Sequence, residues 1–297
     1  MKNKENESTI EVQSPHGHRR TSPVVEHKEN GSAVQADSPR QNRRASLAPE
    51  SKKSESAIQV HDLHKSFDGH SVLNGIDLKV SPGEILAVLG RSGTGKSVLL
   101  KLIVGLQKPD SGSIQVRGQE ITGLSLDELN LVRKKIGFLF QDAALYDSLS
   151  IEENVAFPLR RHNRMPDSEQ KDRARELLAS VGMEEDLNKM PSQISGGMKK
   201  RVGLARALAM EPDILLFDEP TAGLDPITAG EIEELILKLR EERKLASIVV
   251  THDLHGAKTI SDRLALIHEG NILIEGTFAD LKKSKDEFVS QFMNKGS

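Results

Sequence analysis

The hydrophobic positions of this chain follow two patterns from residue 57 onward. Apolar and polar residues alternate over Ile58–Leu63 and Gly75–Val80, as in strands with one buried face. Continuous apolar runs at Ile85–Leu89, Ile214–Phe217 and Ala246–Val250 are typical of parallel strands covered on both faces. The stretches between these runs predict helices over Ser97–Val104, Asp167–Val181, Met198–Met210 and Thr228–Leu239. The pattern predicts an α/β fold with a mostly parallel sheet and an antiparallel sheet at its start.

Composition divides the chain into unequal parts. Residues 1–56 hold ten Lys or Arg, eight Asp or Glu, only eleven apolar residues and no aromatic one. Burial of so few apolar side chains does not offset the entropy lost on ordering the segment. Residues 1–56 are therefore predicted to be a disordered tail. The other 241 residues carry 31 basic and 36 acidic side chains, a net charge of −5. We expect a main domain over 57–285, with an inserted α-helical subdomain at about 142–194, and a short C-terminal extension over 286–297.

Overall composition excludes several classes of protein. The 297 residues include no cysteine, which rules out a disulfide framework, a thiolate metal site and a cysteine nucleophile. Aromatic residues make up 3% and the net charge is −3, so neither stacking nor charge favours nucleic-acid binding. The sequence has no run of about 18 apolar residues, and no membrane-spanning segment is expected.

One glycine-rich run predicts a phosphate-binding loop. It matches G-x-x-x-x-G-K-[ST], follows an apolar strand and begins an apolar helix, which is the context the motif requires. Its backbone N–H groups and the helix N-terminus are suited to phosphates, its lysine to the β- and γ-phosphates, and its serine to Mg²⁺. An ordinary glycine-rich turn is the alternative. The predicted ATP or GTP site comprises Gly90, Arg91, Ser92, Gly93, Thr94, Gly95, Lys96 and Ser97.

Two carboxylates follow the second apolar run. Asp218 and Glu219 are placed at the carboxyl end of a buried strand, where ligands of α/β sheets bind. Asp218 is suited to Mg²⁺, directly or through water, and Glu219 to orienting an attacking water. Many strands end in acids, so this pair is informative only together with the phosphate-binding loop.

A third motif begins a predicted helix. Ser195, Gly196 and Gly197 leave N–H groups and a hydroxyl free for an anion, although an ordinary helix cap would have the same sequence.

The order of these motifs resembles that of ABC-transporter ATPases. The resemblance covers about 57–280, and it is carried by Gly90–Ser97, Gln141, Ile194–Met198, Leu215–Glu219, Gly223–Asp225 and Thr251–Asp253. These correspond to the Walker A motif, Q-loop, signature, Walker B motif, D-loop and H-switch of that family. The signature reads ISGGM here and LSGGQ in most members. The resemblance implies a P-loop ATPase fold that contains an antiparallel β subdomain and an inserted α-helical subdomain.

The family resemblance also implies roles for single residues. Gln141 would contact Mg²⁺ or water, His252 the γ-phosphate and water, and Asp225 the nucleotide site. Phe67 would stack on adenine, where the family often has tyrosine; a core position at a strand end is the alternative. His252 has the alternative of a hydrogen-bonded histidine at a strand end. In such a fold Ser195 lies too far from its own P-loop, so a head-to-tail dimer sharing two ATP sites is implied.

A narrower resemblance concerns the cargo. The segments 140–150, 153–160, 195–198, 225–228 and 286–293 are similar to those of the ATPase subunit of Mla-type, MCE-associated phospholipid transporters of Gram-negative envelopes. This resemblance implies a separate membrane permease, an MCE lipid-binding protein, a STAS-domain subunit and a peripheral position on the cytoplasmic face of the inner membrane. An ATPase for uptake of amino acids or other small solutes is the alternative.

Overall fold

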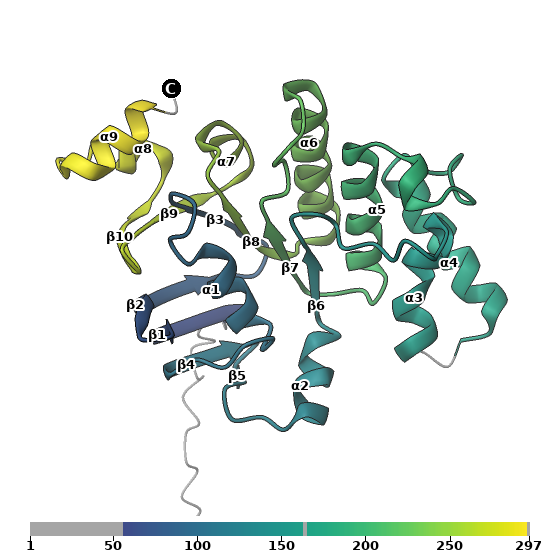
Figure 1. Cartoon of the computed structure of the whole chain (residues 1–297), viewed down its shortest axis with the longest axis horizontal. Coiled ribbons are helices and arrows are strands. Elements are labelled where there is room, and N and C mark those ends of the chain that lie inside the picture. The colour runs from purple at the N-terminus through teal and green to yellow at the C-terminus, as the bar shows by residue number, and fades with distance from the viewer. Residues whose placement is uncertain (1–55, 163–164, 296–297) are drawn as a thin grey trace, which may run out of the picture. The chain divides into compact units, whose positions relative to one another are not determined.

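The computed structural model describes residues 56–162 and 165–295, so the predicted tail lies outside the described residues except for Ser56. Two sheets and a set of helices make up this part of the chain (Figure 1). The strands are β1 (Ile58–Phe67), β2 (His70–Val80), β3 (Ile85–Leu89), β4 (Ser111–Val116), β5 (Gln119–Glu120), β6 (Ile136–Leu139), β7 (Ile214–Asp218), β8 (Ala246–Thr251), β9 (Arg263–His268) and β10 (Asn271–Gly276). The α-helices are α1 (Lys96–Ile103), α2 (Leu126–Arg133), α3 (Ile151–His162), α4 (Asp167–Ser180), α5 (Gly196–Leu208), α6 (Pro226–Arg243), α7 (Leu254–Ile260), α8 (Phe278–Lys282) and α9 (Glu287–Lys295).

The larger sheet has the strand order β10-β9-β3-β8-β7-β6, in which only β10 is antiparallel to its neighbour. Every residue of β3, β7 and β8 is buried. In β7, Leu216 packs with the antiparallel sheet and α1, whereas Leu215 and Phe217 pack with α3–α6. Burial on both faces explains why these strands appear in the sequence as unbroken apolar runs.

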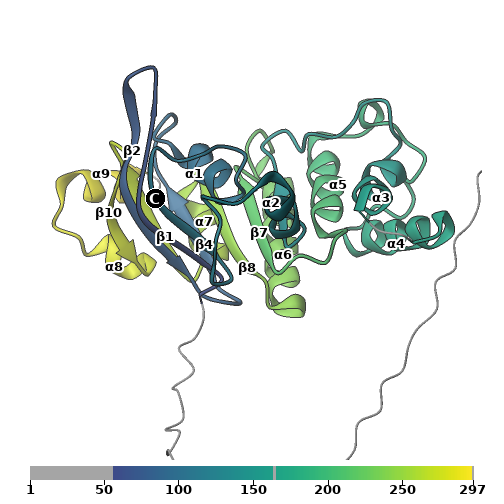
Figure 2. The same ribbon diagram turned by 90° about the horizontal axis from the view of Figure 1, so that it is seen from below.

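The smaller sheet is antiparallel and has the order β2-β1-β4-β5. Its inward residues share one core with α1 and with one face of the larger sheet. In two views at right angles, this sheet lies on one side of β7 and the helices α3 and α4 lie on the other (Figures 1 and 2). The predicted α/β fold with an antiparallel β subdomain is confirmed.

Residues 142–162 and 165–194 contain helices and no strand, as the sequence predicted for an inserted helical segment. Helices α3 and α4 pack together and against α5 through a second apolar core that includes Val155, Leu178 and Leu204. The helices of residues 56–162 and 165–295 include none with the length and apolar character needed to cross a membrane.

The C-terminal extension forms helix α9, which packs on the main domain. Val289 and Met293 are buried in a third core with Leu89 of β3 and Leu254 of α7. Leu89 directly precedes the glycine-rich loop, and α7 follows His252. The C-terminal helix therefore stabilises the two segments that lead to the predicted site.

We predict that Met293→Ala lowers the free energy of unfolding by about 2–5 kcal/mol, because it removes a buried side chain and leaves a cavity. Chemical denaturation of the purified chain measures the change. The control is Gln291→Ala, an exposed position on the same helix that should leave stability within about 0.5 kcal/mol. Equal stability of the two variants would contradict the packing of α9.

Candidate functional site

The glycine-rich loop joins β3 to α1 in a backbone shape that requires glycine. Gly93 and Gly95 have φ angles of +82° and +93°. A Cβ atom on Gly95 would lie 2.7 Å from Leu73 of β2, and one on Gly90 would lie 2.7 Å from the Ile267 carbonyl oxygen. The loop is thus enclosed between the β1–β2 hairpin and β9. A side chain at Gly90 or Gly95 would clash with these neighbours, whereas Gly93 has open space and needs glycine for its φ angle.

Lys96 lies at the start of α1 with its ammonium group inside this loop. Its Nζ donates to the carbonyl oxygens of Gly90 (2.8 Å) and Arg91 (3.1 Å), and it lies 3.6 Å from Glu219 Oε1. The side chain is 6% exposed. Burial lowers the pKa of Lys96, and the nearby carboxylate of Glu219 opposes that shift. The loop therefore holds one buried cation where the sequence predicted phosphate contacts.

Ser97 and Asp218, the residues predicted to bind Mg²⁺ together with Gln141, are in contact. The Ser97 hydroxyl donates to Asp218 Oδ1 over 2.7 Å, which joins the loop to the carboxyl end of β7. Within residues 56–162 and 165–295 there is no cluster of three or more His, Asp or Glu side chains able to hold a metal. A hydroxyl and one carboxylate fit Mg²⁺, which is usually held by few protein ligands, substrate phosphates and water.

Glu219 and His252 form the next contact along the same edge of the sheet. His252 Nδ1 lies 2.9 Å from Glu219 Oε2, and the His252 backbone N–H points at the same oxygen over 3.3 Å. The Glu219 backbone has a φ angle of +48°, and its N–H donates to the carbonyl of Val250 in β8 over 2.9 Å. This turn aims the carboxylate toward Lys96 and His252 together.

Arg91 belongs to the loop itself, and Phe67 is the last residue of β1. Phe67 is 39% exposed at the end of β1, so the alternative of a core position is wrong. Its ring has the ammonium group of Lys65 5.2 Å from its centroid. The Arg91 guanidinium lies 5.4 Å from the ring centroid of Phe288 in α9. Stacking of Phe67 on adenine stays a prediction.

Gln141 follows β6, next to β7, and its side chain is exposed. The hydrogen bonds that hold the backbone of this segment were not predicted from the sequence. The Lys200 ammonium of α5 donates to the carbonyl oxygens of both Gln141 and Glu219, the latter over 2.9 Å. The Arg206 guanidinium donates to the carbonyls of Ala143 and Ala144. Basic residues on a helix are usually solvated, so their spacing alone gave no signal.

The remaining predicted residues form a second group away from the loop. Ser195 caps α5 by accepting a hydrogen bond from the Met198 N–H. Asp225 caps α6, and hydrogen bonds from Thr228 lower the pKa of its carboxyl group. A Cβ atom on Gly197 would lie 2.3 Å from Thr228 Cγ2, so the two helix starts touch. The structure brings Ser195, Gly196 and Gly197 close to Asp225, and none of their described contacts reaches the glycine-rich loop.

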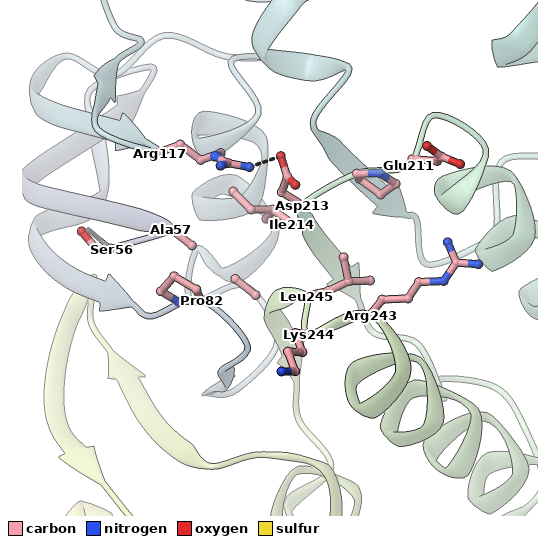
Figure 3. A pocket seen from close by; sticks show the side chains of 12 residues that line it. Ser56, Ala57, Pro82, Arg117, Glu211, Asp213, Ile214, Arg243, Lys244 and Leu245 are labelled. Carbon is pink, nitrogen blue, oxygen red and sulfur yellow. Dashed lines mark ion pairs between the residues drawn. The ribbon is translucent and has the colours of Figure 1, made fainter. Parts of the chain in front are cut away.

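A cavity of about 510 Å³ lies at the opposite, amino ends of β7 and β8 (Figure 3). Arg117 and Asp213 form an ion pair in it, and Arg243 and Lys244 lie at the end of α6. None of the predicted nucleotide-site residues lines this cavity. A cavity of about 490 Å³ instead starts at Glu219 and His252 and continues along the start of α6.

Comparison with known proteins supports the resemblance to ABC-transporter ATPases found in the sequence. Residues 73–222 match the family model described as ABC transporter. The probable ribonucleotide transport ATP-binding protein Mkl of Mycobacterium tuberculosis is 40% identical over 235 residues, 79% of this chain and 66% of Mkl. The intermembrane phospholipid transport system ATP-binding protein MlaF of Haemophilus influenzae is 43% identical over 222 residues, which cover 75% of this chain and 84% of MlaF. The methionine import ATP-binding protein MetN 2 of Bacillus cereus is 42% identical over 224 residues, which cover 74% of this chain and 66% of MetN 2.

A solved structure supports the same family at the level of the fold. The dimeric, post-hydrolysis ATP-binding cassette MJ0796, bound to ADP and Pi, superposes with a TM-score of 0.70 at 35% identity. The superposition covers 74% of this chain and 98% of the cassette. With the glycine-rich loop, Asp218, Glu219 and His252 converging at one edge of the sheet, this chain belongs to the ABC transporter family as one of its ATP-binding cassette ATPases.

Proposed function

We propose that this chain is the ATP-hydrolysing subunit of an ABC transporter that moves phospholipid across or between bacterial envelope membranes through a separate permease. The convergence of Lys96, Ser97, Asp218, Glu219 and His252 is the observation that carries the ATPase assignment. The phospholipid assignment is supported by the relative MlaF, 84% of whose length is matched, against 66% for Mkl and MetN 2.

Each residue of this cluster has a role that its position supports. Lys96 and the N–H groups of the loop bind the phosphates, and Phe67 offers a face to the adenine. Mg²⁺, held by Ser97 and Asp218 and contacted by Gln141, would neutralise charge on the phosphates. Glu219 orients the attacking water and takes up its proton, because its carboxylate lies beside both Lys96 and His252. His252 holds that carboxylate in place and contacts the γ-phosphate.

Two copies are proposed to act head to tail. Ser195, Gly196, Gly197 and Asp225 cluster at the starts of α5 and α6, and the backbone N–H groups at the start of α5 suit an anion. In a head-to-tail pair this cluster of one copy faces the glycine-rich loop of the other, and each nucleotide is held by both. The dimeric state of the MJ0796 cassette supports this arrangement.

A groove beside the Q-loop is the proposed docking site for a helix of the permease. Tyr146 and Phe157, 46% and 37% exposed, have ring centroids 4.6 Å apart. They border a hollow of about 490 Å³ that Phe138, Phe140, Arg133, Lys134 and His162 also line. Exposed aromatic residues with a basic rim favour an apolar helix that carries an acidic residue.

The other partners follow from the Mla-type proposal. A permease would hold this subunit at the cytoplasmic face of the inner membrane, as a peripheral protein. An MCE lipid-binding protein and a STAS-domain subunit would complete the complex. Uptake of an amino acid or another small solute is the second candidate function, and it is supported by the 42% identity to MetN 2.

The substrate class is tested by purifying the full chain with its membrane partners and measuring ATP hydrolysis. Phospholipid vesicles should stimulate hydrolysis, and lipid should co-purify with the complex. Stimulation by methionine or another amino acid, with no response to phospholipid, would favour the second candidate.

For the groove, we predict that Phe157→Asp reduces co-purification of the permease at least about 10-fold, because it places a charge in an apolar contact. ATP binding should stay unchanged. Leu273→Asp, an exposed apolar position on β10, is the control and should keep the permease. Retention of the permease by Phe157→Asp would disprove the docking site.

For the phosphate contacts, we predict that Lys96→Ala weakens ATP binding about 10- to 100-fold, since it removes a charge-assisted contact. Titration calorimetry with MgATP measures the effect. Lys101→Ala, on the last turn of α1, should bind as the unaltered chain does. Normal affinity in Lys96→Ala would count against the P-loop assignment.

For the chemical step, we predict that Glu219→Gln binds ATP normally and turns over at least about 100-fold more slowly. The amide keeps the shape of the side chain but no longer accepts a proton. Exposed Glu241→Gln on α6 serves as the matched control and should hydrolyse ATP at the unaltered rate. Unchanged turnover in Glu219→Gln would refute its assigned role.

A further inference from the structure

Lys200 is a buried cation that bridges two parts of the site. It lies on α5, five residues after Ser195, and is 4% exposed. Its ammonium group donates to the main-chain carbonyls of Gln141 and Glu219, and the Glu219 contact is 2.9 Å. One side chain therefore joins the segment after β6 to the end of β7. The two residues that it joins, Gln141 and Glu219, are those proposed to position water.

The environment of Lys200 explains why a charged group is tolerated there. Burial lowers the pKa of Lys200, and the carboxylates of Asp142, Glu219 and Asp218 oppose that shift. A buried ammonium group is costly unless it is hydrogen-bonded and compensated by nearby charge. Lys200 meets both conditions only while the segments after β6 and β7 keep their present positions.

Both segments need an external donor because their backbones have left the sheet. Glu219 has a φ angle of +48°, and Ala143 and Ala144, just after Gln141, have φ angles of +56° and +46°. Such conformations cost of order 1–3 kcal/mol each and persist only where the surroundings enforce them. Arg206, six residues after Lys200 on α5, holds Ala143 and Ala144 by their carbonyls. Helix α5 thus fixes both turns.

The same helix begins with the signature residues. Ser195 caps it, and Gly203 packs against Leu139 and Ala143, where an added Cβ would lie 2.8 Å and 3.1 Å from side-chain atoms. The signature and Lys200 therefore lie on one continuous helix of 13 residues. Through Lys200, this helix is tied to the backbones of Gln141 and Glu219.

We propose that Lys200 is a positioning residue for ATP hydrolysis, which holds Gln141 and Glu219 in register and couples them to the signature helix. Lys200 does not touch nucleotide in this role. It acts through the two carbonyls, so its loss should slow the chemical step and leave ATP binding by Lys96 and the glycine-rich loop intact. The inference rests on the proposed ATPase function.

The test is Lys200→Met in the full chain purified with its membrane partners. Methionine keeps an unbranched side chain at the site but has no N–H donor. The expected result is a kcat about 10- to 100-fold lower with KM for ATP within about twofold, as for a misplaced catalytic group. Lys200→Arg, which keeps the donors, should restore most of the rate. A normal kcat in Lys200→Met, or an equal loss in Lys200→Arg, would overturn the proposal.

The matched control is Lys199→Met on the neighbouring residue. The Lys199 side chain has no ion pair or hydrogen bond within the part of the chain that the structure describes, and its replacement should leave kcat and KM unchanged. Equal slowing in Lys199→Met would also overturn the proposal. If Lys200→Met does not fold, Lys200→Leu, which also lacks an N–H donor, should show the same selective loss of kcat. A normal kcat in that variant would overturn the proposal. An unaltered chain without ATPase activity would instead disprove the proposed function itself.

Discussion

The site depends on the burial of β3, β7 and β8 on both faces. Because these strands are parallel and fully covered, their carboxyl ends meet at one edge of the sheet. The glycine-rich loop, the Asp218–Glu219 pair and His252 leave from those three ends. The hydrogen bond from Ser97 to Asp218 and the contact of Glu219 with His252 follow from that register. Apolar packing of the sheet thus sets distances of 2.7 Å and 2.9 Å between side chains of the predicted site.

A second constraint is that one chain separates its predicted site residues into two groups. The glycine-rich loop, β7 and His252 form one group, and Ser195–Gly197 with Asp225 form the other. Helix α5 belongs to both, since its first turn carries the signature and its middle holds Gln141 and Glu219 through Lys200. This geometry supports a dimer in which each copy supplies half of each site. Helix α5 then connects the signature residues with Gln141 and Glu219.

The sequence predicts those parts of the fold and the site that a single physical rule determines. Unbroken apolar runs predicted β3, β7 and β8, and the predicted helix over 167–181 agrees with α4 to one residue. The glycine-rich loop was predictable because its glycines are required by backbone shape. By contrast β6 was not predicted, since it has four residues and its Gly137 lies against Leu215 and Ala207 in a way that only tertiary packing reveals. Lys200 and Arg206 were not predicted for the same reason. Lys200 donates to backbone carbonyls 59 residues earlier and 19 residues later in the chain, and Arg206 to one that is 63 residues earlier.

In the proposed dimer, the glycine-rich loop of one copy faces the signature of the other. The chain has no cysteine, so single cysteines can report this contact without interference. Ser92→Cys and Ser195→Cys chains, both altered at exposed positions, would be mixed with MgATP, oxidised and analysed for covalent dimers. We predict ATP-dependent disulfide dimers in the mixture and none with either variant alone. An intramolecular disulfide in a chain carrying both cysteines, with no covalent dimer in the mixture, would contradict it.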